Sequence, residues 1–192
     1  LINNISYNIS ASDERADNNF KFNFKNGVNI TGYERENSDF NTQSVNFYVK
    51  YSQSDEMSLK YFARYSSFSR GVPGIFLGYS TGTARQEDKI VMTGFSFDKK
   101  ISDKIFSKSD LTYQYQHQKY YDPATFNLTT VINSFYKLRR ITASSAYSFL
   151  PSDQFNIESG MELNLDDISS NDTEEGKATQ AAVFAVSKYI FN

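Results

Sequence analysis

Hydrophobic and polar residues alternate along most of this chain. The alternation is clearest between positions 155 and 166. One set there is Phe155, Ile157, Ser159, Met161, Leu163 and Leu165, and the other is Asn156, Glu158, Gly160, Glu162, Asn164 and Asp166. A period of two puts successive side chains on opposite faces of a β-strand. The pattern therefore predicts a two-faced strand over this stretch.

The same period recurs along the chain and predicts an all-β protein of about eight long strands. The other predicted strands span residues 4–12, 42–52, 57–69, 89–99, 105–120, 128–150 and 179–191. Connections of a few residues between long strands make them hairpin neighbours. We therefore expect an antiparallel up-and-down meander.

The predicted connections alternate strictly between short and long. The short ones are 54–56, 101–104 and 151–153, and the long ones are 13–40, 70–88, 121–127 and 167–178. Tight turns at one rim and long loops at the other are typical of a transmembrane β-barrel, whereas a soluble sandwich usually has shorter strands. Inside the first long loop, the alternating Phe20, Phe22 and Phe24 and the Asn26-Gly27 turn predict a small hairpin.

The two faces of the predicted strands differ in chemistry. One carries mostly Tyr, Phe, Val, Ala and Leu, and the other mostly Asn, Ser, Gln, Thr, Glu and Lys. Lipid outside and a wet or plugged lumen inside would explain this division. Aromatic residues near strand ends fit an interfacial girdle. They are Tyr51, Tyr65, Tyr147, Phe149, Phe155 and Tyr189.

Composition agrees with strands and excludes some classes. Aromatic residues make up 16% of the 192 residues, with three Pro and no Cys or Trp. Aromatic side chains favour strands. No stretch approaches the ~18 consecutive apolar residues of a membrane helix. The net charge of -2 gives no basic footprint, so we expect no nucleic-acid partner.

Three short motifs occur in a fixed order. They are R-x-N-x-D at Arg35, Asn37 and Asp39; GVPG at Gly71, Val72, Pro73 and Gly74; and ARQED from Ala84 through Arg85 to Asp88. Together with the turn spacing, they make the chain resemble the barrel of TonB-dependent outer-membrane receptors. We expect Arg35, Asn37, Asp39, Gly71, Pro73, Gly74, Arg85 and Asp88 to have structural roles in the loops.

The resemblance implies a place in the cell outer membrane, in contact with the lipid bilayer. Receptors of this family take up scarce ligands such as iron-siderophores or cobalamin, with energy that the TonB system delivers through a plug. Plugged barrels have ~22 strands. The sequence contains no recognisable plug or TonB box and too few strands. We therefore expect residues 1–192 to be a partial barrel domain, an open section of the wall.

The sequence offers little for catalysis, and we expect no enzyme, cofactor or metal site. His117 is the single histidine and lies in a Gln-rich strand. Asp166-Asp167 and Glu174-Glu175 could collect a calcium ion but fit a solvated acidic loop better. The glycines at 71 and 74 lack the Lys-Ser/Thr and following helix of a phosphate-binding loop.

Binding is the remaining chemistry. In the receptor interpretation a small ligand such as a metal chelate meets the outer loops and upper lumen. Aromatic and arginine side chains there can stack and donate charged hydrogen bonds. The candidates are Tyr33, Arg35, Arg85, Tyr120 and Tyr121.

Two alternatives stay open at the level of sequence. A complete eight-stranded outer-membrane barrel would serve adhesion or structure, and its first and last strands would pair. A soluble β-rich module would use exposed aromatic residues to bind carbohydrate.

Overall fold

The structure is a computed structural model that describes residues 4–73, 82–123, 131–152 and 154–189. It confirms the all-β prediction, with ten antiparallel strands, eight of them in one sheet. In these ranges no helix is long and apolar enough to cross a membrane.

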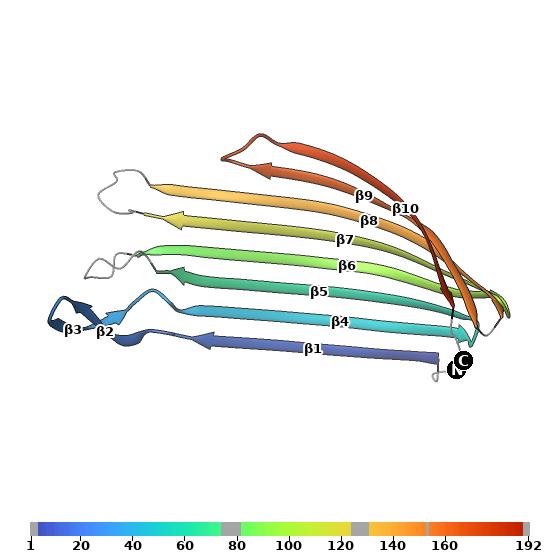
Figure 1. Ribbon diagram of the computed structural model, residues 1–192, viewed down its shortest axis with the longest axis horizontal. Coiled ribbons are helices and arrows are strands. Elements are labelled where there is room, and N and C mark those ends of the chain that lie inside the picture. Colours follow the sequence, from blue (N-terminus) through green and yellow to red (C-terminus); the bar gives the residue numbers. More distant parts are fainter. Residues whose placement is uncertain (1–3, 74–81, 124–130, 153, 190–192) are drawn as a thin grey trace.

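The eight-stranded sheet is a meander in which consecutive strands lie side by side (Figure 1). Its strands in spatial order are β1 (Ile5–Ala16), β4 (Phe40–Ser54), β5 (Met57–Val72), β6 (Ala84–Ser102), β7 (Ile105–Asp122), β8 (Ile132–Ser152), β9 (Phe155–Ser170) and β10 (Gly176–Tyr189). β1 is followed in space by β4 because β2 (Phe20–Asn26) and β3 (Asn29–Arg35) form a hairpin of their own. This is the hairpin that the Phe alternation predicts, and Gly27 turns it with a φ of 61°.

The register keeps the two chemical faces separate across the whole sheet. Within the described residues, register shifts occur only beside the short turns, at Ser52/Ser54, Lys100/Ser102 and Phe149/Ser152. One unbroken row of paired residues consists of Ile9, Phe47, Ala63, Thr93, Tyr113, Ile141, Leu165 and Thr179. Side chains of this parity form what we call the outer face, and those of the other parity form the polar face.

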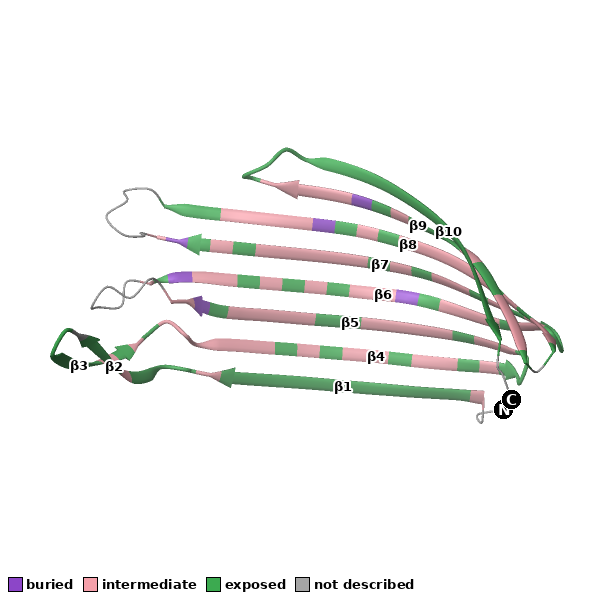
Figure 2. Ribbon diagram, in the orientation of Figure 1, coloured by how far each residue is buried: buried purple, intermediate pink, exposed green. Residues whose placement is uncertain are grey.

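The outer face is exposed, and the described residues form no second layer over it. Tyr7 is 74% exposed, Phe95 51%, Met161 62% and Val183 85%. Among the described hydrophobic residues only Ala84 and Leu138 are buried. Figure 2 accordingly shows few buried positions along the strands, and the described part of the sheet has no hydrophobic core of its own.

The polar face is more crowded than the outer face. Arg140 binds Asp166 through two hydrogen bonds of 2.6 Å, and the Lys60 ammonium lies 2.5 Å from the Asp98 carboxylate. Along much of β6 and the middle of β7 and β8, polar-face residues are half-buried where their outer-face neighbours are exposed, whereas β5 does not follow this pattern. Side chains crowd on the concave side of a curved sheet, which indicates that the polar face is the concave one.

The strands are longer than the sequence predicts at the end of the sheet that carries the long connections. β5 and β6 include residues 70–72 and 84–88, which the alternation assigns to a loop. The connection expected over 167–178 is only 171–175, so the prediction of a long loop there is wrong. The strand ladder continues through polar residues whose pattern does not indicate a strand.

The sheet is open. In the described part of the chain, β1 pairs only with β4, and β10 pairs only with β9. The pairing between first and last strands that a complete eight-stranded barrel requires is absent from these residues.

Candidate functional site

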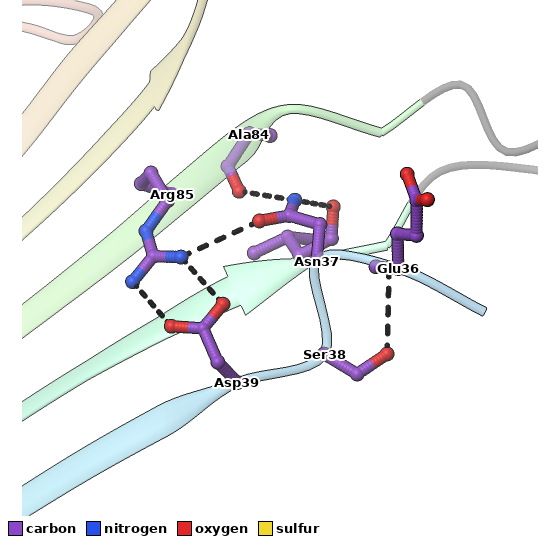
Figure 3. Close-up of polar contacts among 7 residues, drawn as sticks. Glu36, Asn37, Ser38, Asp39, Ala84 and Arg85 are labelled. Carbon is purple, nitrogen blue, oxygen red and sulfur yellow. Dashed lines mark hydrogen bonds and ion pairs between the residues drawn. The ribbon is translucent and has the colours of Figure 1, made fainter. Parts of the chain in front are cut away.

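The three sequence motifs meet at the long-connection end of the sheet. Figure 3 shows the contacts of Asn37 and Asp39 with Ala84 and Arg85. The Arg85 guanidinium donates to both carboxylate oxygens of Asp39, over 2.7 and 2.8 Å. The Gly71 amide donates to the Asp39 carbonyl oxygen over 2.9 Å. One aspartate thus ties the start of β4 to the end of β5 and the start of β6.

Asn37 completes this contact. Its side-chain amide donates to the carbonyl oxygens of Val72 (3.1 Å) and Ala84 (2.9 Å), and its own oxygen accepts from Arg85 (3.4 Å). Its φ of 56° is left-handed, a conformation that asparagine tolerates better than most residues. Asn37 therefore bridges β5 and β6 just where the two strands separate.

Gly71 makes the close approach possible. A Cβ at this position would lie 2.4 Å from both the backbone and side-chain oxygens of Asn37. Real contacts are never this short, so only glycine fits without moving Asn37. We call Asn37, Asp39, Gly71 and Arg85 the loop-end latch.

The electrostatics of the latch favour the charged forms. Hydrogen bonding and the charge of Arg85 lower the pKa of the Asp39 carboxyl, against the opposing effect of burial. The same pair raises the pKa of Arg85. Both side chains are about two-fifths exposed (39%), so solvent screens the interaction. The latch is a structural ion pair at neutral pH.

The other motif residues lie outside the latch. Arg35 ends β3, where its backbone pairs with Phe20. Pro73 directly follows β5, and Asp88 lies on the polar face of β6. Gly74 lies outside the described residues, so its predicted role stays a prediction.

A second cluster lies on the polar face beside the latch. The Arg70 guanidinium carbon lies 5.5 Å from the centre of the Phe68 ring, and its Nη2 donates to Gln86 over 2.8 Å. Gln86 in turn donates to Asp88 over 2.9 Å, and the Phe40 and Phe68 rings are 6.5 Å apart. We call these five residues the upper polar patch.

This patch can do what the sequence analysis expects of a ligand site. It combines an exposed arginine and aromatic rings with an amide that can both donate and accept hydrogen bonds. The second carboxylate oxygen of Asp88 is shielded and has no hydrogen-bond partner among the described residues. The patch therefore offers stacking and positive charge at its surface, while the shielded Asp88 oxygen is not accessible to a ligand.

The five predicted ligand residues are not gathered in one place. Tyr33 and Arg35 belong to the β2–β3 hairpin, where the Tyr33 ring centre lies 6.1 Å from that of Phe22. Arg85 and Tyr121 are cross-strand partners on the outer-face side. Tyr120 lies on the polar face, opposite Gln86 of the patch. Burial, with a contribution from Asp122, raises the pKa of Tyr120.

Sequence reasoning missed most of the patch. Arg70 and Gln86 fall in the stretch predicted as loop, where the alternation assigns no face. Phe62, Arg64 and Ser66 alternate on the polar face, and the same alternation continues to Phe68 and Arg70. Extending it beyond the predicted end of the strand places Arg70 on the polar face, opposite Gln86.

The described residues show no metal centre. They contain no group of three or more His, Cys, Asp or Glu side chains arranged to hold an ion. Asp166 is engaged with Arg140 on the polar face, and Asp167 lies 3.3 Å from Arg139 on the outer face. The two adjacent carboxylates thus point to opposite sides of the sheet.

Comparison with known proteins leaves the assignment to the structure and the sequence: no protein-family model and no curated protein matches this chain.

Proposed function

We propose that this chain is a section of the wall of an outer-membrane β-barrel of the TonB-dependent receptor type. In this proposal it takes part in the uptake of a scarce ligand such as an iron-siderophore or cobalamin. The observation that carries the proposal is the outer face, which is mostly apolar across eight strands, with charged residues toward the long-connection end, and which no described residue covers.

Physical chemistry makes the exposed face the decisive feature. Apolar area left in water costs roughly 25 cal/mol per Å² relative to burial. Contiguous apolar surface of this width marks a membrane or protein contact. Acyl chains supply the missing apolar surroundings without a second protein layer.

The open edges support a larger wall. A membrane-spanning sheet must satisfy every backbone donor and acceptor, so it closes on itself. The free edges of β1 and β10 would therefore pair with further strands of the complete barrel. The same edges in water would promote aggregation.

The site supports transport rather than adhesion. The upper polar patch lies on the concave face, which becomes the lumen in this proposal. Its arginine and aromatic rings suit a polar or negatively charged ligand. The latch fixes the strand ends from which the loops leave. The TonB system would act through a plug that fills the barrel.

Single-cysteine labelling tests membrane residence. These 192 residues contain no cysteine, so each introduced thiol is the single one in this section, and any cysteine elsewhere in the full-length protein is first replaced by serine. Phe95→Cys and Leu111→Cys lie on the outer face, and the neighbouring Ser96→Cys and Thr112→Cys on the polar face. With an environment-sensitive fluorophore on the full-length protein in outer-membrane vesicles, we expect spin-labelled lipids to quench only the first pair. Equal quenching of both pairs would contradict the proposal, as would soluble expression without detergent.

Uptake measurements test the receptor function separately. We expect cells with the gene to accumulate labelled ferric siderophore or cobalamin in a TonB-dependent manner. Arg70→Ala should reduce this uptake several-fold, because it removes the guanidinium of the upper polar patch. Arg64→Ala, on the same strand and face, is the matched control and should keep normal uptake. A barrel in the membrane without TonB-dependent uptake would support the structural alternative instead.

A further inference from the structure

A row of basic side chains crosses the outer face near the long-connection end. Lys89 of β6, His117 of β7 and Lys137 of β8 are direct cross-strand partners. Lys119 follows two residues further along β7 and has the same parity. Four basic residues on adjacent strands therefore share one small area of the outer face.

The three lysines have no ion-pair partner among the described residues, although Glu87 stands opposite Lys119 in the register. Other charges at this height are matched, since Arg139 pairs with Asp167 and Arg85 with Asp39. The Lys137 ammonium lies 4.8 Å from the Phe135 ring centre, which fixes its direction without neutralising it. The area thus carries net positive charge.

His117 adds an imidazole ring between Lys89 and Lys137 in the same row. Its ring lies 6.4 Å from that of Phe135. The three lysines carry the positive charge on which the inference depends.

The apolar surface begins in the next row toward the short turns. Val91 and Tyr115, two residues from Lys89 and His117, are partners in that row, which on β8 holds Arg139, paired with Asp167. Thr93, Tyr113 and Ile141 form the following row. Val91 is 38% exposed, Tyr113 38% and Ile141 43%. Positive charge and apolar surface are thus continuous along β6 and β7, and on β8 the paired Arg139 stands between Lys137 and Ile141.

We propose that Lys89, Lys119 and Lys137 bind the phosphate of a membrane lipid whose acyl chains lie along the apolar surface of β6, β7 and β8. An amphiphile with an anionic head matches both parts of the area, whereas a soluble anion matches only the lysines. The cluster lies on the open outer face and not in an enclosed cavity that would hold a free phosphate ion. The inference rests on the proposed membrane location.

Native mass spectrometry of the full-length protein in detergent micelles tests the inference. The probes are phosphatidic acid and phosphatidylcholine with identical acyl chains. We expect phosphatidic acid to bind at least about tenfold more tightly, since each lysine near an anionic headgroup contributes to binding. The triple variant Lys89→Gln, Lys119→Gln and Lys137→Gln should lose this preference.

A matched triple variant controls for overall charge. Lys21→Gln, Lys25→Gln and Lys188→Gln remove the same charge from the hairpin and from the far end of β10, and should keep the preference. Inorganic phosphate at the concentration of the lipid should not displace phosphatidic acid. If the first triple variant fails to fold by circular dichroism, Lys137→Gln and the salt dependence of the wild-type protein decide the question.

The inference is overturned if the wild-type protein does not distinguish the two lipids, or if both triple variants lose the preference equally. Displacement by inorganic phosphate would also overturn it, because the lysines would then recognise phosphate alone. If the outer-face fluorophores are quenched by lipid but phosphatidic acid is not preferred, only this inference fails. If they are not quenched, the membrane location fails with it.

Discussion

The contacts of the loop-end latch require a residue without a side chain at position 71. We predict that Gly71→Ala displaces Asn37, because the new Cβ would meet its backbone oxygen at 2.4 Å. The loss should be about 1–3 kcal/mol, the usual cost of overpacking. Faster amide hydrogen exchange at residues 70–72 and 84–86 would report it.

Gly176→Ala is the control for this substitution. Nothing lies within 4 Å of the position that its Cβ would take, and its φ is not left-handed. Exchange and stability should be unchanged there. Equal effects of the two substitutions would contradict the role of the latch.

The Asp39–Arg85 pair predicts a pH dependence of the same strand ends. Because the pKa of Asp39 is lower in the folded protein than its usual value of 3.8, the pair contributes stability above that value and loses it as the pH falls through the folded pKa. The contribution is less than ~1 kcal/mol for a pair this exposed. We expect exchange at residues 70–72, corrected for its intrinsic rate, to be flat from neutral pH to about pH 5 and to rise below the usual carboxyl range.

Asp39→Asn provides the comparison. It keeps the shape of the side chain but removes the charge, so exchange should be faster than in the wild-type protein at neutral pH, and the rise at low pH should disappear as the two proteins converge. A variant that keeps the pH profile of the wild-type protein would show that another group causes it.

The sequence motifs include all four latch residues, but they do not indicate what those residues contact. An Arg, an Asn, an Asp and a Gly in short motifs indicate turns and charged hydrogen bonds. Asp39 and Arg85 are 46 positions apart, and only the register of β4, β5 and β6 brings them together. For the same reason, Arg85 as a ligand residue stays a prediction, while its contact with Asp39 is a finding.

At the level of strands, two glycines are each covered by an aromatic ring from the neighbouring strand. Phe62 lies over Gly94 and Phe184 over Gly160, in direct cross-strand pairs. Rings over strand glycines shield backbone that would otherwise be open. The two pairs lie on the polar face, where they add apolar contact between polar neighbours.

We predict that Gly94→Ala destabilises the sheet by about 1–3 kcal/mol through overpacking. Its Cβ would lie 2.7 Å from the Phe62 ring and 2.9 Å from the Leu111 carbonyl oxygen, and the backbone atom cannot move aside cheaply. Denaturant unfolding in detergent measures the loss. Combining Gly94→Ala with Phe62→Leu should restore part of the lost stability, because the smaller side chain leaves room for the new methyl group. If no stability is restored, the clash with the Leu111 carbonyl oxygen accounts for the whole loss.

Strand periods were predictable, and strand ends were not. The alternation at 155–166 needs only local sequence, so it correctly indicated β9. Residues 84–88 are mostly charged or polar, yet they belong to β6 because β5 and β7 offer hydrogen-bonding partners on both sides. Such a strand ends where backbone pairing with the adjacent strands ends, and the local sequence pattern carries no information about that pairing.

At the level of the whole molecule, the outer face should reject charge. We predict that Phe95→Arg reduces insertion into lipid vesicles by about 2–4 kcal/mol, the cost of arginine near the middle of a bilayer. Ser96→Arg, one residue away on the polar face, should insert normally. Insertion is measured by protection from protease, and equal insertion of the two variants would contradict a lipid-facing role.

The architecture followed from the sequence because alternation and turn spacing both reflect a sheet that separates two environments. The upper polar patch did not follow, because Phe40, Arg70 and Gln86 come from three strands and meet only through the register. The alternation along the chain predicts which face a side chain lies on. A site also depends on which residues of neighbouring strands are paired, and the alternation does not predict that.

A sheet without an interior has no volume to conserve. Met161 and Leu163 leave 62% and 39% of their surface exposed, and no packed partner among the described residues fixes their shape across a core. Larger or smaller apolar side chains at such positions should therefore be exchanged at little cost, while a change of polarity should not. The size of an outer-face side chain is therefore weakly constrained in this molecule, whereas its polarity and the strand register are strongly constrained.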